Sequence, residues 1–361
     1  MILLLYLLCG IAALYQLAAL IAAVKHVLAR EKPPTRFPKV SILKPVHGRD
    51  DAFFEAALRS HTQIDYPDYE LLFGVGGMDD EAVPFVRRLS ATVYVRKDHT
   101  SNAKAGTLIE LSRHAKGEII VVNDADIRVT PDYLQRIVAP LEDSRTGLVT
   151  CLYRPVPDGI PAMWESLGIA VDFAPSTLVA PLVGINEFGL GSTLCFRAED
   201  LREIGGFAAV ADYLADDYQL ARRITTQLGK RSVMSTRIVD TGIGYKRWSE
   251  MWSHQVRWAR TIRVSRGDGY LGLPVTHAGV WVALALLCGL PMVAAGLAVL
   301  RMLTGFVAGF VLLRCPQALA LPLIPVWDIW AFGAWIAGLR GDSIVWRGRR
   351  QRLSPDGRLL D

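Results

Sequence analysis

The sequence predicts an α/β domain with a mostly parallel sheet, accompanied in the chain by helices that cross a membrane. Between residues 39 and 122, short runs of β-branched and apolar residues alternate with helical patterns, which is typical of a parallel sheet flanked by helices. Residues 1–24 and 276–339 are apolar over lengths that suit membrane spans. With 51% hydrophobic residues, the chain is too apolar for a purely soluble protein and too polar for membrane helices alone.

The amino-terminal stretch, residues 1–24, predicts an uncleaved transmembrane anchor. It contains no charged side chain, and basic residues follow it at Lys25, Arg30 and Lys32. A signal peptide would instead have a basic start and a small-residue cleavage site. The positive-inside rule places the basic residues, and the domain that follows them, in the cytoplasm.

The apolar region before the carboxy-terminal tail favours about two membrane spans. One candidate covers residues 278–300 and another covers residues 318–339, whereas residues 303–313 are too few to cross alone. The tail, residues 340–361, is rich in arginine, which places it in the cytoplasm and requires an even number of crossings. Asp328 would be costly in lipid, so it should face protein or the interface.

We place the soluble domain at residues 36–265. Its expected strands cover residues 39–46, 69–75, 91–95, 119–122, 148–153 and 188–197. Its expected helices cover residues 53–63, 83–89 and 215–228, with further helices opening at 102 and 131. Residues 163–183 are apolar but contain Asp172 and several prolines, so they form either a buried helix or a helix lying on the bilayer.

The five cysteines are scattered along the chain and show no C-x-x-C spacing. Some of them lie within apolar runs. We therefore interpret them as small core residues in a reducing compartment, and not as disulfide partners or zinc ligands.

The expected strand at residues 119–122 runs directly into Asp124 and Asp126. Ligands of open α/β sheets bind just beyond the carboxyl ends of the strands. Two carboxylates separated by one residue can share a divalent cation, and hard oxygen ligands suit Mg²⁺ or Mn²⁺ bridging a diphosphate. Such a pair is also common in solvated turns and helix caps, so the other motifs decide its interpretation.

The chain contains six polar motifs, including this aspartate pair. They are Lys44-Pro45, Asp79-Asp80, Asn102-Ala103-Lys104, Asp124-Ala125-Asp126, Asp216-Asp217-Tyr218 and His254-Gln255-Val256-Arg257-Trp258. In this order the chain resembles the membrane-bound inverting glycosyltransferases of the GT-A fold. It is most similar to ceramide glucosyltransferases and to bacterial relatives that glycosylate hopanoid polyols. The resemblance covers residues 41–263 and extends into the tail at 346–350.

The resemblance implies a donor site for a UDP-sugar. Asp126 would bind the divalent metal, Mg²⁺ or Mn²⁺, and Asp124 would lie near the ribose, the diphosphate and the same metal. Lys104 would be a counter-charge, and Lys44 and Asn102 would belong to the same substrate-binding set. Such a metal stabilises the departing UDP as a Lewis acid.

Asp79 and Asp80 would lie at the uridine end of that site. Here the sequence departs from the family pattern, because Gly77 stands where relatives usually carry an acid. Which of the two aspartates contacts the nucleoside therefore stays open, and a simple surface turn is the alternative.

The resemblance makes Asp217 the catalytic base that takes the proton from the acceptor hydroxyl. One base suffices for a single inverting displacement, unlike the carboxylate pair of glycoside hydrolases. Asp216, in the substrate-binding set, would crowd Asp217 and raise its pKa. The alternative is a pair of helix-capping acids, which is favourable at a helix amino terminus.

His254, Arg257 and Trp258 correspond to the family's Gln/Arg-x-x-Arg-Trp signature, with His254 in place of the usual Gln or Arg. Arg257 can clamp a phosphate oxygen, and Trp258 offers a stacking face or a wall of the acceptor pocket. An amphipathic helix at the membrane interface also explains Trp and Arg here, and both interpretations can hold. The segment 191–193 would form the floor of the acceptor site.

These expectations favour a hexosyltransferase that moves a sugar from UDP to a membrane lipid, in glycolipid or sphingolipid metabolism. The lipid is ceramide or, as an alternative, a hopanoid polyol, and the protein would lie in a bacterial inner membrane. Further alternatives are a processive polysaccharide synthase, which normally needs more spans, and a non-catalytic UDP-sugar-binding membrane protein. Nucleic acid is not an expected partner, because the arginines cluster at the membrane-proximal ends and suit anionic lipid headgroups.

Overall fold

The computed structural model describes residues 2–48, 52–89, 91–244, 247–346 and 349–360. They form two compact units. The sheet unit comprises Arg30–Tyr153, Asn186–Gly242 and Gly357–Asp361, and the helical unit comprises Met1–Ala29, Arg154–Ile185 and Ile243–Asp356. Two parts of the expected soluble domain, residues 154–185 and 243–265, thus belong to the helical unit.

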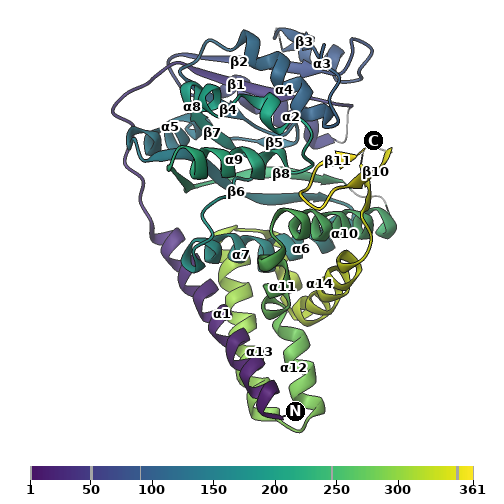
Figure 1. Cartoon of the computed structure of the whole chain (residues 1–361). Coiled ribbons are helices and arrows are strands. Elements are labelled where there is room, and N and C mark those ends of the chain that lie inside the picture. The colour runs from purple at the N-terminus through teal and green to yellow at the C-terminus, as the bar shows by residue number, and fades with distance from the viewer. Residues whose placement is uncertain (1, 49–51, 90, 245–246, 347–348, 361) are drawn as a thin grey trace. The chain divides into compact units, whose positions relative to one another are not determined.

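The sheet unit is built on an eight-stranded sheet with the strand order β3-β2-β1-β4-β7-β6-β8-β5 (Figure 1). Strands β3, β2, β1 and β4 are parallel to one another, and β7 then pairs antiparallel with β4 and with β6. The strands are β1 Val40–Pro45, β2 Tyr69–Val75, β3 Val93–Val95, β4 Ile119–Val122, β5 Ile127–Arg128, β6 Thr146–Asp158, β7 Leu194–Arg197 and β8 Arg231–Gly244. The α/β fold with a mostly parallel sheet is confirmed.

Helices cover both faces of this sheet. The helices of the unit are α2 Ala52–Ser60, α3 Val83–Arg88, α4 Ala103–His114, α5 Tyr133–Val138, α8 Ala198–Glu203 and α9 Asp216–Gln227. In strand β4, Val121 packs towards α5, while Ile120 and Val122 pack towards α4, α8 and α9. A strand buried on both faces explains why these residues form one continuous apolar run and not an alternating one.

Two strands of this sheet, β5 and β8, were not expected from the sequence. Between Gly229 and Arg247 the structure places the long strand β8, and β8 pairs antiparallel with the two-residue strand β5. Strand β8 contains several β-branched residues, but most of its positions are only partly buried and buried positions do not alternate with exposed ones, so the sequence carries no clear period-two signal there. Strand β8 matters because it brings Thr241 to the carboxyl end of β4.

The helical unit contains α1 Ile2–Leu28, α6 Ile160–Gly168, the π-helical segment Ile169–Phe173, α7 Ala174–Val179, α10 Trp248–Ser265, α11 Gly267–Gly272, α12 Ala278–Leu287, α13 Pro291–Phe306 and α14 Ile324–Leu339. The residues expected as one span at 278–300 instead belong to two helices, α12 and α13, between which the chain reverses its direction (Figure 1). Gly289 has φ +73° at this reversal, a conformation that favours glycine. The tail forms a hairpin of β9 Ser343–Trp346 and β10 Arg349–Leu353, and Arg347 and Gly348 of the tail motif lie outside the described residues.

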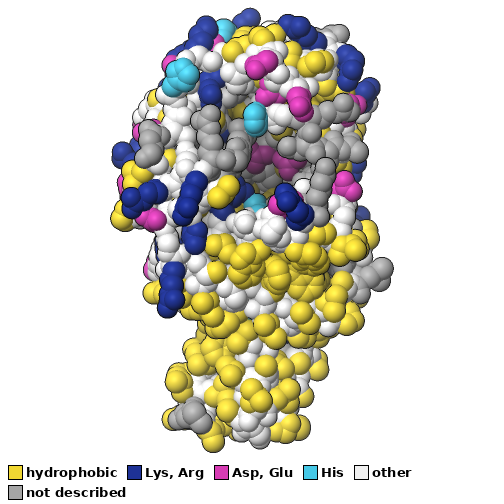
Figure 2. Space-filling model, turned by 90° about the vertical axis from the view of Figure 1, so that its right-hand side faces the viewer, with side chains coloured by type: hydrophobic (Ala, Val, Ile, Leu, Met, Phe, Trp, Pro, Cys, Tyr) yellow, Lys and Arg dark blue, Asp and Glu magenta, His cyan; other side chains and the backbone are white. Residues whose placement is uncertain are grey.

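Four helical stretches of the described chain are long and apolar enough to cross a membrane: Ile2–Leu28, Ile160–Val183, Pro291–Leu312 and Ala320–Leu339. A bent pair, Gly267–Thr276 with Ala278–Leu287, would be a fifth if it formed one span. Exposed apolar side chains cover these helices, including Leu3, Leu287 and Met292, and Figure 2 shows this surface. The two carboxy-terminal stretches agree with about two spans, a number that stays a prediction.

Asp328 lies in α14 and is fully buried against protein. Arg301 of α13 donates to both of its carboxylate oxygens, at 3.1 and 2.6 Å, and the N–H of Gly279 donates to it at 2.7 Å. The remaining guanidinium nitrogen of Arg301, Nη1, donates to the carbonyl of Val171 at 2.7 Å. The expectation that Asp328 faces protein is therefore confirmed.

Candidate functional site

The turn after β4 carries Asp124 and Asp126, and the side chain of Lys44 contacts the main chain of this turn. Lys44 is the last residue but one of β1, and its side chain is fully buried. Its ammonium group donates to the main-chain carbonyl of Asp124 at 2.7 Å. Burial lowers the pKa of Lys44 to about 7, and the nearby carboxylates of Asp126 and Asp124 oppose that shift. The structure thus places Lys44 where it fixes the turn.

Asp126 is held by β8, a strand that was not expected from the sequence. The hydroxyl of Thr241 on β8 donates to its carboxylate at 2.5 Å, and the N–H of Gly242 donates to its carbonyl at 3.2 Å. Burial and the neighbouring Asp124 raise the pKa of Asp126 to about 6. The ionised form of Asp126 is therefore less favourable than that of an ordinary exposed aspartate.

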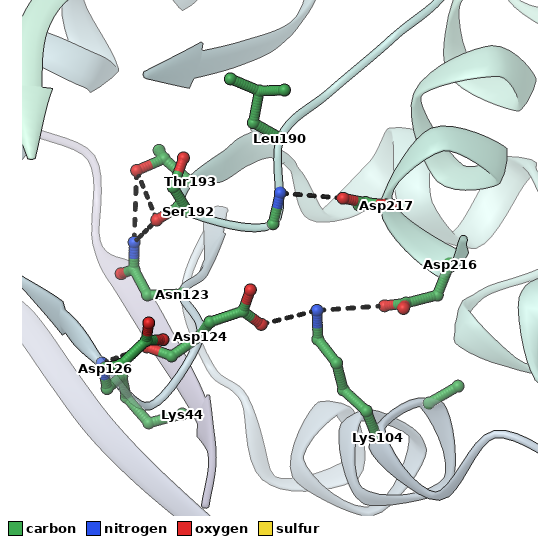
Figure 3. A network of polar contacts seen from close by, with 12 residues as sticks. Lys44, Lys104, Asn123, Asp124, Asp126, Leu190, Ser192, Thr193, Asp216 and Asp217 are labelled. Carbon is green, nitrogen blue, oxygen red and sulfur yellow. Dashed lines mark hydrogen bonds and ion pairs between the residues drawn. The ribbon is translucent and has the colours of Figure 1, made fainter. Parts of the chain in front are cut away.

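Lys104 joins two of the predicted acidic motifs (Figure 3). Its ammonium group lies 2.7 Å from Asp124 Oδ1 and 3.4 Å from Asp216 Oδ2. Burial disfavours its charge, but Asp124, Asp216 and Asp217 outweigh burial and raise the pKa of Lys104 above its usual range. Lys104 therefore stays positively charged among these carboxylates.

Asn102 sets the position of Lys104. Its side-chain carbonyl accepts from the N–H groups of Lys104 and Ala105, so it caps the amino terminus of α4. Its amide group donates to the carbonyl of Tyr213 at 2.8 Å and to Asp216 Oδ1 at 3.3 Å. Asn102 thus ties the start of α4 to the start of α9.

Asp217 lies at the amino terminus of α9 and is held by main-chain groups. Its Oδ2 accepts from the N–H of Gly191 at 2.9 Å, which is the contact drawn to Asp217 in Figure 3. Its Oδ1 accepts from the N–H of Tyr218 at 2.8 Å. Burial and the adjacent Asp216 raise the pKa of Asp217 to about 6, against the opposing effect of Lys104. Its carboxylate is thus ionised at neutral pH but is a stronger base than an ordinary aspartate.

Gly191 lies between the two acidic motifs. A Cβ atom at this position would lie 2.6 Å from Asp124 Oδ2 and 3.3 Å from Asp217 Oδ2. Its carbonyl also accepts from the N–H of Asp124 at 3.2 Å. By contrast, Ser192 and Thr193 are buried and belong to a polar network around Asn123, so they support the segment from beneath.

The donor set fits a divalent cation. Asp124 and Asp126 offer hard oxygen ligands, and the raised pKa of Asp126 marks a carboxylate that a cation would stabilise. Among the described residues, no three His, Cys, Asp or Glu side chains form a metal-binding group. The protein would therefore supply two carboxylates, and substrate oxygens and water would complete the shell, as Mg²⁺ prefers.

The structure distinguishes Asp79 from Asp80. The carboxylate of Asp80 accepts from the N–H groups of Gly48 and Ala82, at 2.9 and 3.0 Å, and bonds to the His47 ring at 3.0 Å. Asp79 is exposed, and its Oδ1 lies 2.4 Å from where a Cβ of residue 77 would be. Gly77 therefore leaves room for the Asp79 carboxylate, which makes Asp79 the better candidate for the nucleoside.

His254, Arg257 and Trp258 lie on α10 in the helical unit. His254 Nδ1 forms a hydrogen bond of 2.8 Å with Glu165 Oε1, which also accepts from Gln255 at 2.9 Å. Glu165 of α6 is buried and was not expected from the sequence, because no local motif marks it. His254, in place of the family's Gln or Arg, is thus part of a buried polar cluster.

Trp258 lines a cavity of about 150 Å³ in the helical unit. Its walls come from the π-helical segment, α10, α14 and residues 270–277, and include Phe173, Tyr270, Trp327 and Trp335. The cavity agrees with the expectation that Trp258 forms the wall of a pocket.

Comparison with known proteins identifies the family. A family model described as "Glycosyl transferase family 21" matches residues 4–359. Ceramide glucosyltransferase 1 of Caenorhabditis elegans is 26% identical over 215 residues, 57% of this chain and 46% of that protein. The UDP-forming cellulose synthase catalytic subunit of Pseudomonas fluorescens (strain SBW25) is 24% identical over 245 residues, 63% of this chain and 31% of that protein. The chain spans less than half the length of these relatives.

A solved structure supports the fold. Mannosyltransferase PcManGT from Pyrobaculum calidifontis, in complex with GDP-Man and Mn²⁺, aligns over 92% of this chain and 99% of its own at a TM-score of 0.53 and 20% identity. This similarity confirms the GT-A fold. Since the family model covers almost the whole chain, the protein belongs to glycosyl transferase family 21, and its sequence is similar to those of ceramide glucosyltransferases.

Proposed function

We propose that the protein moves a hexose from a UDP-sugar to the hydroxyl of a membrane lipid, with inversion at the anomeric carbon. One observation carries the proposal: between the end of β4 and the start of α9, Lys104 bridges Asp124 and Asp216, and the main chain of Gly191 connects Asp124 with Asp217. This arrangement offers positive charge for a diphosphate beside a carboxylate of raised pKa. A glycosyltransferase needs both groups within one site.

On the donor side, Lys104 would bind the diphosphate, and Asp79 would contact the nucleoside. Asp124 and Asp126 would hold Mg²⁺ or Mn²⁺, which supplies Lewis-acid stabilisation of the departing UDP. Lys44, Asn102 and Thr241 do not need to touch the substrate. Their contacts fix the loop and the helix start that carry these groups.

On the acceptor side, Asp217 would take the proton from the attacking hydroxyl. An inverting transfer is a single displacement, so one base is enough. The two main-chain N–H donors orient the carboxylate, and its raised pKa strengthens it as a base. Arg257 and Trp258 of the family signature are proposed as further substrate-binding residues.

A lipid acceptor is supported by the apolar helices and by the relatives' names. Several helices of the chain are long enough to cross a bilayer, and two of the relatives are ceramide glucosyltransferases. We therefore propose ceramide as the acceptor, with a hopanoid polyol as the alternative. We further propose a cytoplasmic active site at a bacterial inner membrane, which the basic residues after α1 and in the tail support.

A processive polysaccharide synthase is the second candidate function, because the cellulose synthase catalytic subunit is also similar over 63% of the chain. A synthase must conduct its polymer, which favours more spans than the four or five candidates found in the described residues. A non-catalytic binding protein is less favoured, because Asp124, Asp126 and Asp217 are all present.

The test is transfer by the purified full-length protein. Labelled UDP-glucose and UDP-N-acetylglucosamine would each be offered with ceramide and with a hopanoid polyol, with and without EDTA. We expect one glycosylated lipid product, inverted at the anomeric carbon, and its loss on addition of EDTA. A polymer would favour the synthase, and absence of transfer by folded protein that still binds UDP-sugar would favour the non-catalytic alternative.

A further inference from the structure

The cavity beside α10 is lined by one acidic side chain that has no role in the proposed sugar transfer. Asp172 lies in the π-helical segment Ile169–Phe173, and the cavity that it lines also receives Gln255 and Trp258 from α10. A π-turn inside an α-helix is uncommon and is found frequently at functional sites. Here it occurs within Ile160–Val183, one of the candidate membrane-crossing stretches.

The surroundings of Asp172 do not satisfy its carboxylate. In the described part of the chain its closest partner is His277, whose Nδ1 lies 3.7 Å from Asp172 Oδ2, beyond hydrogen-bond distance. The side chain of Asp172 is 18% exposed and that of His277 is 6% exposed. The positive charge of Arg301 acts on Asp172, but a largely buried carboxylate that accepts no hydrogen bond remains costly unless a ligand or water donates to it.

The rest of the lining suits hydrocarbon. Aromatic rings of Phe173, Trp258 and Trp327, together with Ala331 and Ala334, make up much of the wall. Phe173 and Trp258 pack with their ring centroids 5.6 Å apart. A volume of about 150 Å³ accommodates a short length of acyl chain and one polar group, but not a whole lipid.

We propose that this cavity binds the acceptor lipid where its hydrocarbon meets its polar end, with the Asp172 carboxylate accepting a hydrogen bond from a lipid hydroxyl or amide N–H. The inference rests on the proposed lipid acceptor and adds a named recognition residue to it. The chemistry that Asp172 recognises is an uncharged hydrogen-bond donor next to an apolar chain. A sphingoid amide and a polyol hydroxyl both provide it, so the two are separated by experiment.

Binding is tested separately from transfer. Full-length protein in nanodiscs would be photolabelled with three diazirine lipids: a ceramide, a long-chain polyol and a fatty acid methyl ester that lacks a hydrogen-bond donor. We expect mass spectrometry to find the label on residues 168–176 and 255–262 for the ceramide or the polyol, and little label from the ester. The lipid that labels more strongly identifies the source of the donor group.

Two variants connect this labelling to the cavity. Asp172→Leu removes the acceptor and should lower labelling and raise the lipid KM roughly tenfold or more, while Asp172→Asn should recover part of the loss. Ala334→Phe fills the cavity, and Ile336→Phe is its control because Ile336 of the same helix is 49% exposed. UDP-sugar affinity and melting temperature should stay close to those of the wild type in the Asp172 variants.

The outcomes separate this inference from the proposed function. Labelling that depends on Asp172 supports the inference even if no sugar is transferred to any lipid. Transfer with an unchanged lipid KM in Asp172→Leu and Ala334→Phe, or equal labelling by the methyl ester, would overturn the inference and leave the proposed transferase intact.

Discussion

The N–H of Gly191 donates to Asp217 Oδ2 at 2.9 Å, so the proposed base is oriented by the main chain of a neighbouring segment. The same residue accepts from the N–H of Asp124 through its carbonyl. One glycine thus connects the proposed donor-binding turn with the proposed base. This connection makes the position of Asp217 depend on a residue that carries no functional side chain.

Gly191→Ala is therefore expected to impair catalysis. The added Cβ would lie 2.6 Å from Asp124 Oδ2, so the turn or the carboxylate must shift. A displacement of about 1 Å near reacting groups can lower turnover on the order of a hundredfold. Steady-state transfer with labelled UDP-sugar measures the effect. Gly267→Ala is the control, since nothing lies within 4 Å of its added Cβ; equal turnover of the two variants would contradict the role given to Gly191.

The rate should depend on pH through Asp217. Because the pKa of Asp217 is raised to about 6, the free protein loses its ionised base as the pH falls below that value. We expect kcat/KM for transfer to fall tenfold per pH unit there. In Lys104→Met the inflection should move to higher pH, because Lys104 lowers the pKa of Asp217. An unchanged inflection in Lys104→Met would show that another group limits the rate.

Asp217 should also reduce the stability of the fold at neutral pH. Its pKa is higher in the folded protein, about 6, than the ordinary 3.8, so the folded state binds its proton more tightly. The contribution of Asp217 to the free energy of unfolding therefore falls as the pH rises from about 4 to about 6. Asp217→Asn should raise the melting temperature at pH 7.5, and the gain should disappear near pH 4. A lower melting temperature at pH 7.5 would contradict the unfavourable charge.

The stability of the fold should depend on Arg301 and Asp328 being present together. Asp328→Ala leaves the Arg301 guanidinium buried without its carboxylate, which costs about 3–5 kcal/mol in comparable buried pairs. The double variant Arg301→Met, Asp328→Leu should recover most of that loss. Thermal unfolding in detergent measures both. If the double variant is as unstable as Asp328→Ala, packing at these positions, and not charge, sets the stability.

The sequence predicts the elements whose signals are local. The strand at Ile119–Val122 and the helix that opens at Asn102 both appear in the structure at their expected places. Strand β8 was missed because its residues are mostly partly exposed, so its apolar pattern is weak. The turn between α12 and α13 was missed because hydropathy does not register a change of direction at Gly289.

In the predicted site, too, the sequence identifies residues that belong to local motifs and misses residues whose partners are distant in the chain. Motif order brings Asp124, Lys104, Asp216 and Asp217 to one place, and the structure agrees. Thr241 and Glu165 escaped detection because each acts through a partner distant in sequence, Asp126 and His254. The sequence also could not distinguish Asp79 from Asp80. The carboxylate of Asp80 is bonded to His47 and Gly48, and no local spacing of residues predicts these contacts.

The most direct test of the central claim is single-turnover transfer by Asp217→Asn, measured beside equilibrium binding of the UDP-sugar. Loss of a general base lowers the rate by roughly 10²–10⁴-fold, and we expect a loss in that range with donor affinity close to that of the wild type. Asp212→Asn, at an exposed acid shortly before α9, is the matched control and should transfer sugar normally. Near-wild-type transfer by Asp217→Asn would contradict the assignment of Asp217 as the base.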